Sequence, residues 1–151
     1  MGLDMYLLKK TYIKNWSFME ASERHEVSVK LGGEPHPDIQ PERVSEIVEQ
    51  VAYWRKANAI HSWFVSNVQH GEDNCAEYYV NREQLEALVQ ECKAVLDKKA
   101  NPQSVLPTKE GFFFGSYEYD EWYYGSLHET VDMIEPLLKE EGGTFYYTSS
   151  W

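Results

Sequence analysis

Three polar side chains, Arg55, Asn58 and His61, stand among large apolar residues in the segment from Tyr53 to Val65. If this segment is helical, spacings of three residues place the three side chains next to one another. A guanidinium, an amide and an imidazole beside Trp54 could together bind a phosphate, a carboxylate or the edge of a nucleobase. These four residues are therefore the first candidate ligand-binding site.

The same polar side chains also have a structural interpretation. Arg55 would form an ion pair, Asn58 would tie down a loop, and His61 would be an interior histidine with satisfied hydrogen bonds. Three carboxylates are available as the partner of Arg55: Asp4, Glu118 and Asp120. Buried polar groups are normally paired and only sometimes functional, so both interpretations stay open.

A second set of candidates lies in the aromatic and acidic segment from residue 112 to residue 124. We expect Tyr117, Tyr119 and Trp122 to close a cavity over the first site, where their rings would stack on a ligand. Glu118 and Asp120 would share one face of a predicted strand, about 7 Å apart. Carboxylates at that separation can perform acid–base hydrolysis, although alternating tyrosines and acids are also typical of an exposed strand face.

Signatures of the common enzyme classes are missing from the sequence. It contains no glycine-rich phosphate loop, no G-x-S-x-G and no H-E-x-x-H. Cys75 and Cys92 form no C-x-x-C pair and have no histidine at zinc-finger spacing. We therefore predict no catalytic residue, no metal site and no cofactor, and the sequence favours a binding protein over an enzyme.

The charge balance narrows the choice of partner. The chain has 151 residues and a formal net charge of −11, and 15% of its residues are aromatic. Proteins that bind nucleic acids or anionic membranes need clustered Lys and Arg, so neither is an expected partner. An acidic surface keeps a protein soluble and can also bind a basic protein. With no signal peptide and no apolar run of about 20 residues, we expect a cytoplasmic protein.

The hydrophobic pattern predicts one α+β domain over residues 1–151, with a small, mostly antiparallel sheet packed on one long central helix and two further helices. The long helix is predicted from Pro41 to Gln69, because apolar residues recur there at helical spacing. The second helix should begin at an Asn81 capping box, and the third at a Ser126 capping box. Strands are predicted at Met1–Lys10, His25–Leu31, Phe112–Tyr119 and Thr144–Ser149.

Several segments form a pattern that extends over most of the chain: Met1–Leu7, Tyr53–Phe64, Gly111–Ser116, Tyr119–Tyr123 and the closing Ser149-Ser150-Trp151. In these segments the chain resembles a family of small proteins carried by bacteriophages and prophages. The resemblance implies a phage accessory protein in the cytoplasm of a bacterial host, and it assigns no catalytic residue.

These observations lead to two main functional hypotheses. In the first, a non-catalytic protein binds and inhibits a host protein, such as a defence or nucleic-acid-binding factor, through an acidic and aromatic surface. In the second, the Trp/Arg/Asn/His pocket sequesters a small anionic or aromatic ligand such as a nucleotide. A hydrolase that uses Glu118 and Asp120 ranks behind both. The sequence leaves the oligomeric state open.

Overall fold

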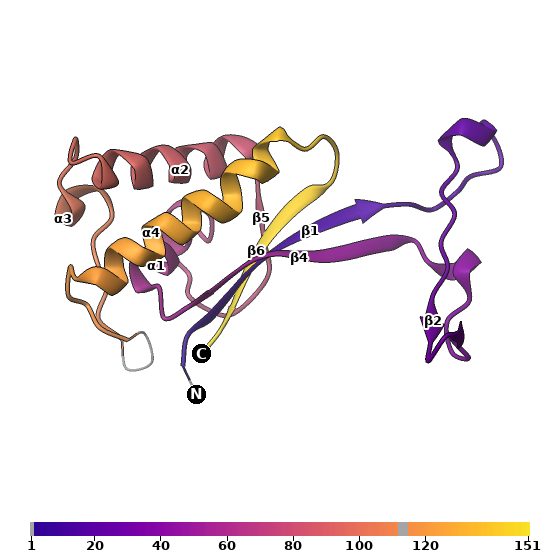
Figure 1. Cartoon of the computed structure of the whole chain (residues 1–151), viewed down its shortest axis with the longest axis horizontal. Helices are drawn as coiled ribbons and strands as arrows, with labels where there is room; N and C mark the ends of the chain where they lie inside the picture. The colour runs from indigo at the N-terminus through magenta and orange to yellow at the C-terminus, as the bar shows by residue number, and fades with distance from the viewer. Residues whose placement is uncertain (1, 112–114) are drawn as a thin grey trace.

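The computed structural model describes residues 2–111 and 115–151, which form an antiparallel sheet with helices packed on one face (Figure 1). The strands are β1 (Asp4–Tyr12), β4 (Glu46–Arg55), β5 (Tyr78–Val80) and β6 (Thr144–Ser150), in the spatial order β4-β1-β6-β5. The helices are α1 (Asn58–Asn67), α2 (Arg82–Leu96), α3 (Pro102–Val105) and α4 (Glu121–Ile134), which the 3-10 helix η3 (Glu135–Lys139) continues. The predicted α+β class is confirmed, as are the strands expected near the two ends of the chain.

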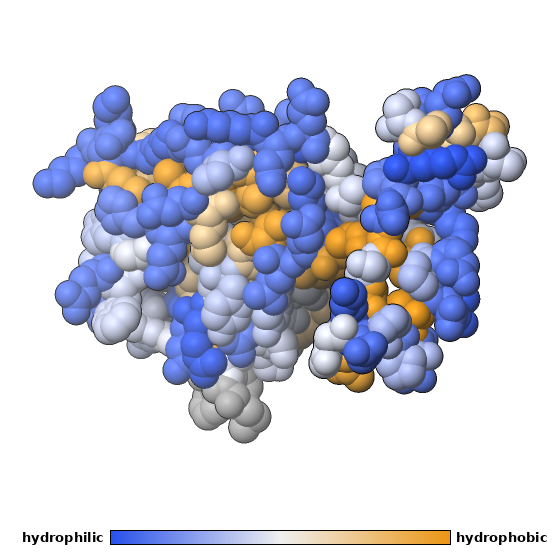
Figure 2. Space-filling model, turned by 45° about the vertical axis from the view of Figure 1, so that its right-hand side comes forward, coloured by the Kyte–Doolittle hydropathy of each residue, from blue (hydrophilic) through white to orange (hydrophobic). Residues whose placement is uncertain are grey.

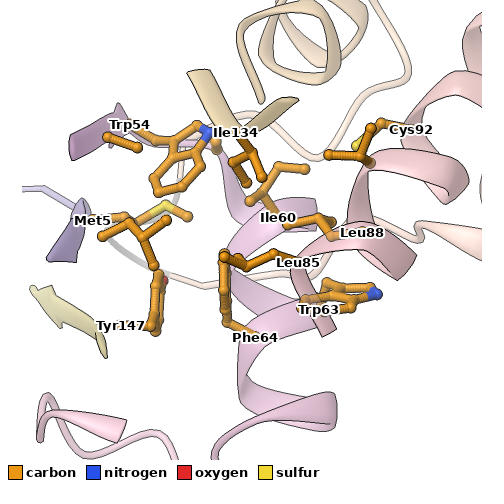
Figure 3. Packing of buried hydrophobic residues seen from close by; sticks show 14 of the residues in the cluster. Met5, Trp54, Ile60, Trp63, Phe64, Leu85, Leu88, Cys92, Ile134 and Tyr147 are labelled. Carbon is orange, nitrogen blue, oxygen red and sulfur yellow. The ribbon is translucent and has the colours of Figure 1, made fainter. Parts of the chain in front are cut away.

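The core lies between the sheet and its helices (Figure 3). Side chains alternate between the two faces of a strand, so Met5 and Leu7 of β1 and Ala52 and Trp54 of β4 enter this layer. Met5 of β1 lies opposite Trp54 of β4, and both are buried. Phe64 of α1 stacks on Tyr147 of β6, with 3.9 Å between the ring centroids and an angle of 5° between the planes.

The predicted helix from Pro41 to Gln69 is wrong, because residues 46–55 form strand β4 and only residues 58–67 form helix α1. The apolar residues of the first half had helical spacing, but most of them are β-branched and favour a strand. Between strand and helix, Lys56 adopts a left-handed backbone conformation with φ 54°. The longest helical stretch in the part of the chain that the structure describes is instead residues 121–139.

Strands β1 and β4 extend beyond the helices and lead into residues 13–45, which we call the arm (Figure 1). The arm contains β2 (Lys30–Leu31), β3 (Glu34–Pro35) and the 3-10 helices η1 (Ala21–Glu23) and η2 (Pro41–Arg43). The strand predicted over His25–Leu31 is therefore wrong except for its last two residues. Residues 25–29 pair with no described strand, and period-two alternation needs a partner strand to become a ladder.

The region before α4 also departs from the prediction. Residues 115–120 form no strand, and residues 112–114 lie outside the described residues. Helix α4 begins at Glu121 and not at Ser126, because Asp120 caps it: the Asp120 Oδ1 accepts hydrogen bonds from the backbone N–H groups of Trp122 and Tyr123, both at 3.1 Å. The Asn81 capping box of α2 is confirmed.

Candidate functional site

An open groove of about 1180 Å³ runs along the end of β4 and one side of α4. We call it the β4–α4 groove. Tyr53, Arg55 and Lys56 line one side of it. The opposite side is lined by α4, with Trp122, Ser126, Glu129 and Met133 among its residues. These four recur every three or four residues, so they form one stripe along the helix.

Five of the nine predicted site residues line this groove: Arg55, Asn58, Glu118, Asp120 and Trp122. The predicted strand is absent from residues 115–119, but the loop that these residues form still brings Glu118 and Asp120 to the first candidate segment. Glu118 and Asp120 do not share a strand face, because Asp120 is engaged as the helix cap of α4. The hydrolase hypothesis therefore loses the arrangement on which it was based.

Trp54 and His61 do not line the groove but are buried in the core. The Trp54 Nε1 donates to the Thr130 Oγ1 at 2.8 Å, which joins β4 to α4. The His61 Nδ1 lies 2.6 Å from the Tyr147 hydroxyl, and its Nε2 lies 3.0 Å from each carboxylate oxygen of Asp73. Both side chains form hydrogen bonds that hold separate elements together. The structural interpretation of this segment predicted such a role for His61.

Burial lowers the pKa of His61 below its ordinary value, and the hydrogen bond that His61 donates to Asp73, which raises that pKa, offsets the effect only in part. The imidazole is therefore neutral near pH 7. Since the carboxylate of Asp73 accepts, the Nε2 of His61 carries the proton, and its Nδ1 accepts from the Tyr147 hydroxyl. This arrangement holds α1 and β6 together, and Trp151 adds a further hydrogen bond to Asp73, at 2.9 Å.

Arg55 and Asn58 line the groove and also make the structural contacts that the second interpretation predicted. The Arg55 Nη1 donates to the Asp4 Oδ1 at 3.3 Å. The Asn58 Nδ2 donates to the Ser116 carbonyl at 2.6 Å, and its Oδ1 accepts from the Lys109 backbone N–H at 3.1 Å. Asn58 therefore ties Ser116 and Lys109 to the start of α1.

The two remaining predicted residues, Tyr117 and Tyr119, do not line the groove. Tyr117 is 53% exposed, whereas Tyr119 is half-buried and its ring packs edge-on against Tyr123 at 4.9 Å. The Tyr119 hydroxyl accepts from the Thr108 backbone N–H at 3.2 Å. Tyr119 thus supports the loop behind the groove and does not close a cavity over Trp54.

Lys56 is a groove residue that the sequence analysis missed. Its side chain runs past two glycines: a Cβ on Gly115 would lie 3.1 Å from the Lys56 Cβ, and a Cβ on Gly2 would lie 3.3 Å from the Lys56 Cε. Gly115 also has φ 80°, a conformation that L-residues rarely adopt. The glycine in the aromatic segment was the available signal, since it indicates a close backbone approach.

The groove is acidic. Its lining residues include five carboxylates and two cations. The carboxylates are Glu118, Asp120, Glu121, Glu129 and Asp132, and the cations are Arg55 and Lys56. Glu129 and Asp132 were also missed from the sequence, because nothing in it placed α4 next to the end of β4. Trp122 stands among these charges with 77% of its surface exposed.

The described residues contain no group of three or more His, Cys, Asp or Glu side chains that could hold a metal ion. The same residues contain no helix with the length and apolar character needed to cross a membrane. Comparisons with models of protein families, with curated proteins and with solved structures find no match.

Proposed function

We propose that this chain is a non-catalytic binding protein whose β4–α4 groove receives a basic segment of a partner protein. The observation that carries the proposal is the joint presence in one open groove of five carboxylates and the exposed ring of Trp122. Exposed tryptophan is uncommon away from binding surfaces, and it is enriched where proteins meet.

The chemistry of the groove suits lysine and arginine side chains. Carboxylates form charge-assisted hydrogen bonds with guanidinium and ammonium groups. The face of an indole ring attracts the same cations, by about 0.5–2 kcal/mol depending on solvent exposure. The net charge of −11 would steer a basic partner toward the chain and speed association at low salt.

The charge of the groove also ranks the alternatives. A nucleotide or another anionic ligand would meet mainly carboxylates, and the Arg55 guanidinium already pairs with Asp4. This weighs against the small-ligand hypothesis. The resemblance to phage and prophage proteins supports a more specific version of the proposal, in which the basic partner belongs to the bacterial host and is inhibited on binding.

The experiment is a capture of proteins from bacterial lysate on the immobilised chain, at low salt and again at about 0.5 M salt, where screening acts within a few ångströms. A partner that binds through the groove should be captured by wild type at low salt and released at high salt. The double variant Glu129→Gln/Asp132→Asn should capture much less of it. Capture that is indifferent to both changes would contradict the proposal.

The matched control is the double variant Glu83→Gln/Glu86→Gln on α2, which removes the same formal charge from exposed residues outside the groove. If this control loses as much capture as the groove variant, then net charge and not the groove accounts for binding. Trp122→Ala supplies a second test, because it removes the exposed ring without altering any charge.

A further inference from the structure

We propose that the partner segment binds as an extended strand that adds to the outer edge of β4, an inference that rests on the proposed function. In the sheet order β4-β1-β6-β5, β4 has a neighbour on one side only. No described strand pairs with its other side. An unpaired strand edge presents a row of backbone donors and acceptors that can template another strand.

The unpaired backbone N–H and C=O groups at the end of β4 face the groove. The Lys56 N–H donates to the Leu3 carbonyl at 2.8 Å, so this N–H points toward β1. In an antiparallel ladder, successive residues point their N–H and C=O groups to alternate sides. The groups of Arg55 and Tyr53 therefore point away from β1, and both residues line the groove.

Helix α4 completes the site, because it forms a wall beside this edge. From Trp122 to Met133 the wall is about 17 Å long at 1.5 Å per helical residue. That length matches about five residues of extended chain at about 3.3 Å each. A strand laid along β4 would thus lie between a backbone template and a wall of side chains, the arrangement in which peptides add to sheets.

The carboxylates define the side chains of the added strand. Alternate residues of a strand face the same side, so every second side chain would lie against α4, where Glu129 and Asp132 are exposed. Basic residues at alternate positions would meet these carboxylates, and Trp122 lies at one end of the same wall. The groove therefore fits an extended segment in which Lys or Arg alternates with strand-favouring residues such as Val or Thr.

The experiment uses a synthetic peptide of about seven residues that alternates Arg and Val, with both ends blocked. Two analogues keep every side chain and every charge but carry N-methyl groups, on all Arg amides in one and on all Val amides in the other. A methylated amide cannot donate a hydrogen bond. In an added strand only one of the two amide sets faces β4, so the two analogues separate backbone pairing from charge attraction.

We expect the parent peptide and one analogue to bind the wild-type chain, and the other analogue to bind about tenfold more weakly or worse, since several hydrogen bonds of about 1 kcal/mol each are lost. Binding should also slow the hydrogen exchange of the Tyr53 and Arg55 amides by a factor of about ten or more. The amide of Trp54, which points toward β1, is the internal control.

Each other outcome overturns a defined part of the argument. If both analogues bind as tightly as the parent peptide, strand addition is wrong while the acidic groove stands as a binding site. If the parent peptide does not bind at low salt, the proposed function itself fails. If light scattering shows that the chain dimerises and that Tyr53→Pro abolishes the dimer, a second copy occupies the edge of β4 and the peptide proposal is overturned.

Discussion

The two ends of the β1–β4 ribbon have the same backbone pairing but opposite surroundings. Near the helices, Leu7 pairs with Ala52 and both side chains are buried in the core. Toward the arm, Lys10 pairs with Val48, and Val48 is 53% exposed. Figure 2 shows hydrophobic atoms reaching the surface on the arm and where it meets the rest of the molecule. Pairing therefore continues well beyond the region that apolar burial stabilises.

This difference indicates where the stability of the fold resides. Burying a large apolar side chain contributes about 1.5–3 kcal/mol, and such side chains are concentrated at the helix-covered end. A segment with few buried apolar contacts opens locally at a lower free-energy cost than the core does. We therefore expect the arm to open without unfolding of the sheet.

The largest effect is expected for Phe64→Ala at the covered end. Phe64 is fully buried, stacks on Tyr147 and meets Trp63 edge-on with 5.2 Å between the ring centroids. The substitution leaves a cavity, so the free energy of unfolding should fall by about 3–5 kcal/mol in urea titrations. A loss below about 1 kcal/mol would mean that the stacked rings are not the centre of the core.

Asn58→Ala should have the next largest effect, because it removes the hydrogen bonds that tie Lys109 and Ser116 to the start of α1. Two backbone partners lose their contacts, and we expect a loss of about 1–3 kcal/mol in the free energy of unfolding. The same variant should make the chain more sensitive to limited proteolysis next to Lys109 and Ser116. Asn67→Ala, at an exposed position near the end of α1, is the matched control. Equal losses in the two variants would contradict the fastening role of Asn58.

The His61 network predicts a dependence of stability on pH. Because burial lowers the pKa of His61 in the folded state, the unfolded chain takes up a proton near pH 6.5 while the folded chain does not. Stability should therefore fall as the pH drops below about 6.5, at a rate of at most about 1.4 kcal/mol per pH unit. Unfolding free energies measured between pH 7.5 and 5.5 provide the test.

Two variants isolate the contribution of His61 to that pH profile. His61→Gln should lower stability at pH 7.5 but show a flatter profile, with the difference from wild type shrinking by about 1 kcal/mol toward pH 5.5. His128→Gln removes an exposed imidazole on α4 and serves as the matched control. Parallel profiles for wild type and His61→Gln would show that another group causes the pH dependence.

The smallest effect is expected for Phe18→Ala in the arm, the same substitution as at Phe64. Phe18 is 80% exposed, so its truncation leaves no cavity in a core. The free energy of unfolding should therefore change by less than about 0.5 kcal/mol. Hydrogen exchange should likewise be faster in residues 13–45 than in α1. If Phe18→Ala is as destabilising as Phe64→Ala, the two ends of the ribbon are not energetically distinct.

The contrast between the two ends also explains what the sequence could predict. Helix α2 has one buried side, which includes Leu85, Leu88 and Cys92. The spacing of its apolar residues in the sequence therefore predicted the helix correctly. In β4, Ile47 and Val48 are exposed. Their helical spacing therefore did not reflect contact with a core, and it resembled the spacing of a helix by coincidence. Periodicity predicts an element only where the periodic residues meet a core.

The candidate site was predictable in part for a similar reason. The residue types in segments 55–61 and 117–122 made both segments candidates. The contact of Asn58 with Ser116 helps to bring residues of these two segments to one groove. The wall of α4 was not predictable, because the approach of Glu129 and Asp132 to the end of β4 depends on tertiary packing. His61 was a candidate because of its residue type alone. Its partner Tyr147 lies far from it in the sequence, and its partner Asp73 lies in a loop without regular structure, so neither contact could be predicted.

The position of β6 sets the order in which the chain can acquire its fold during translation. β6 lies between β1 and β5, and residues 144–150 leave the ribosome after every other strand of the sheet. At about 5–20 residues per second, β1 waits on the order of ten seconds for this neighbour. During that interval the apolar side chains of β1 and α1 lack the Phe145 and Tyr147 rings that cover them in the finished protein. Until β6 is made, these uncovered apolar side chains should make the nascent chain prone to aggregation.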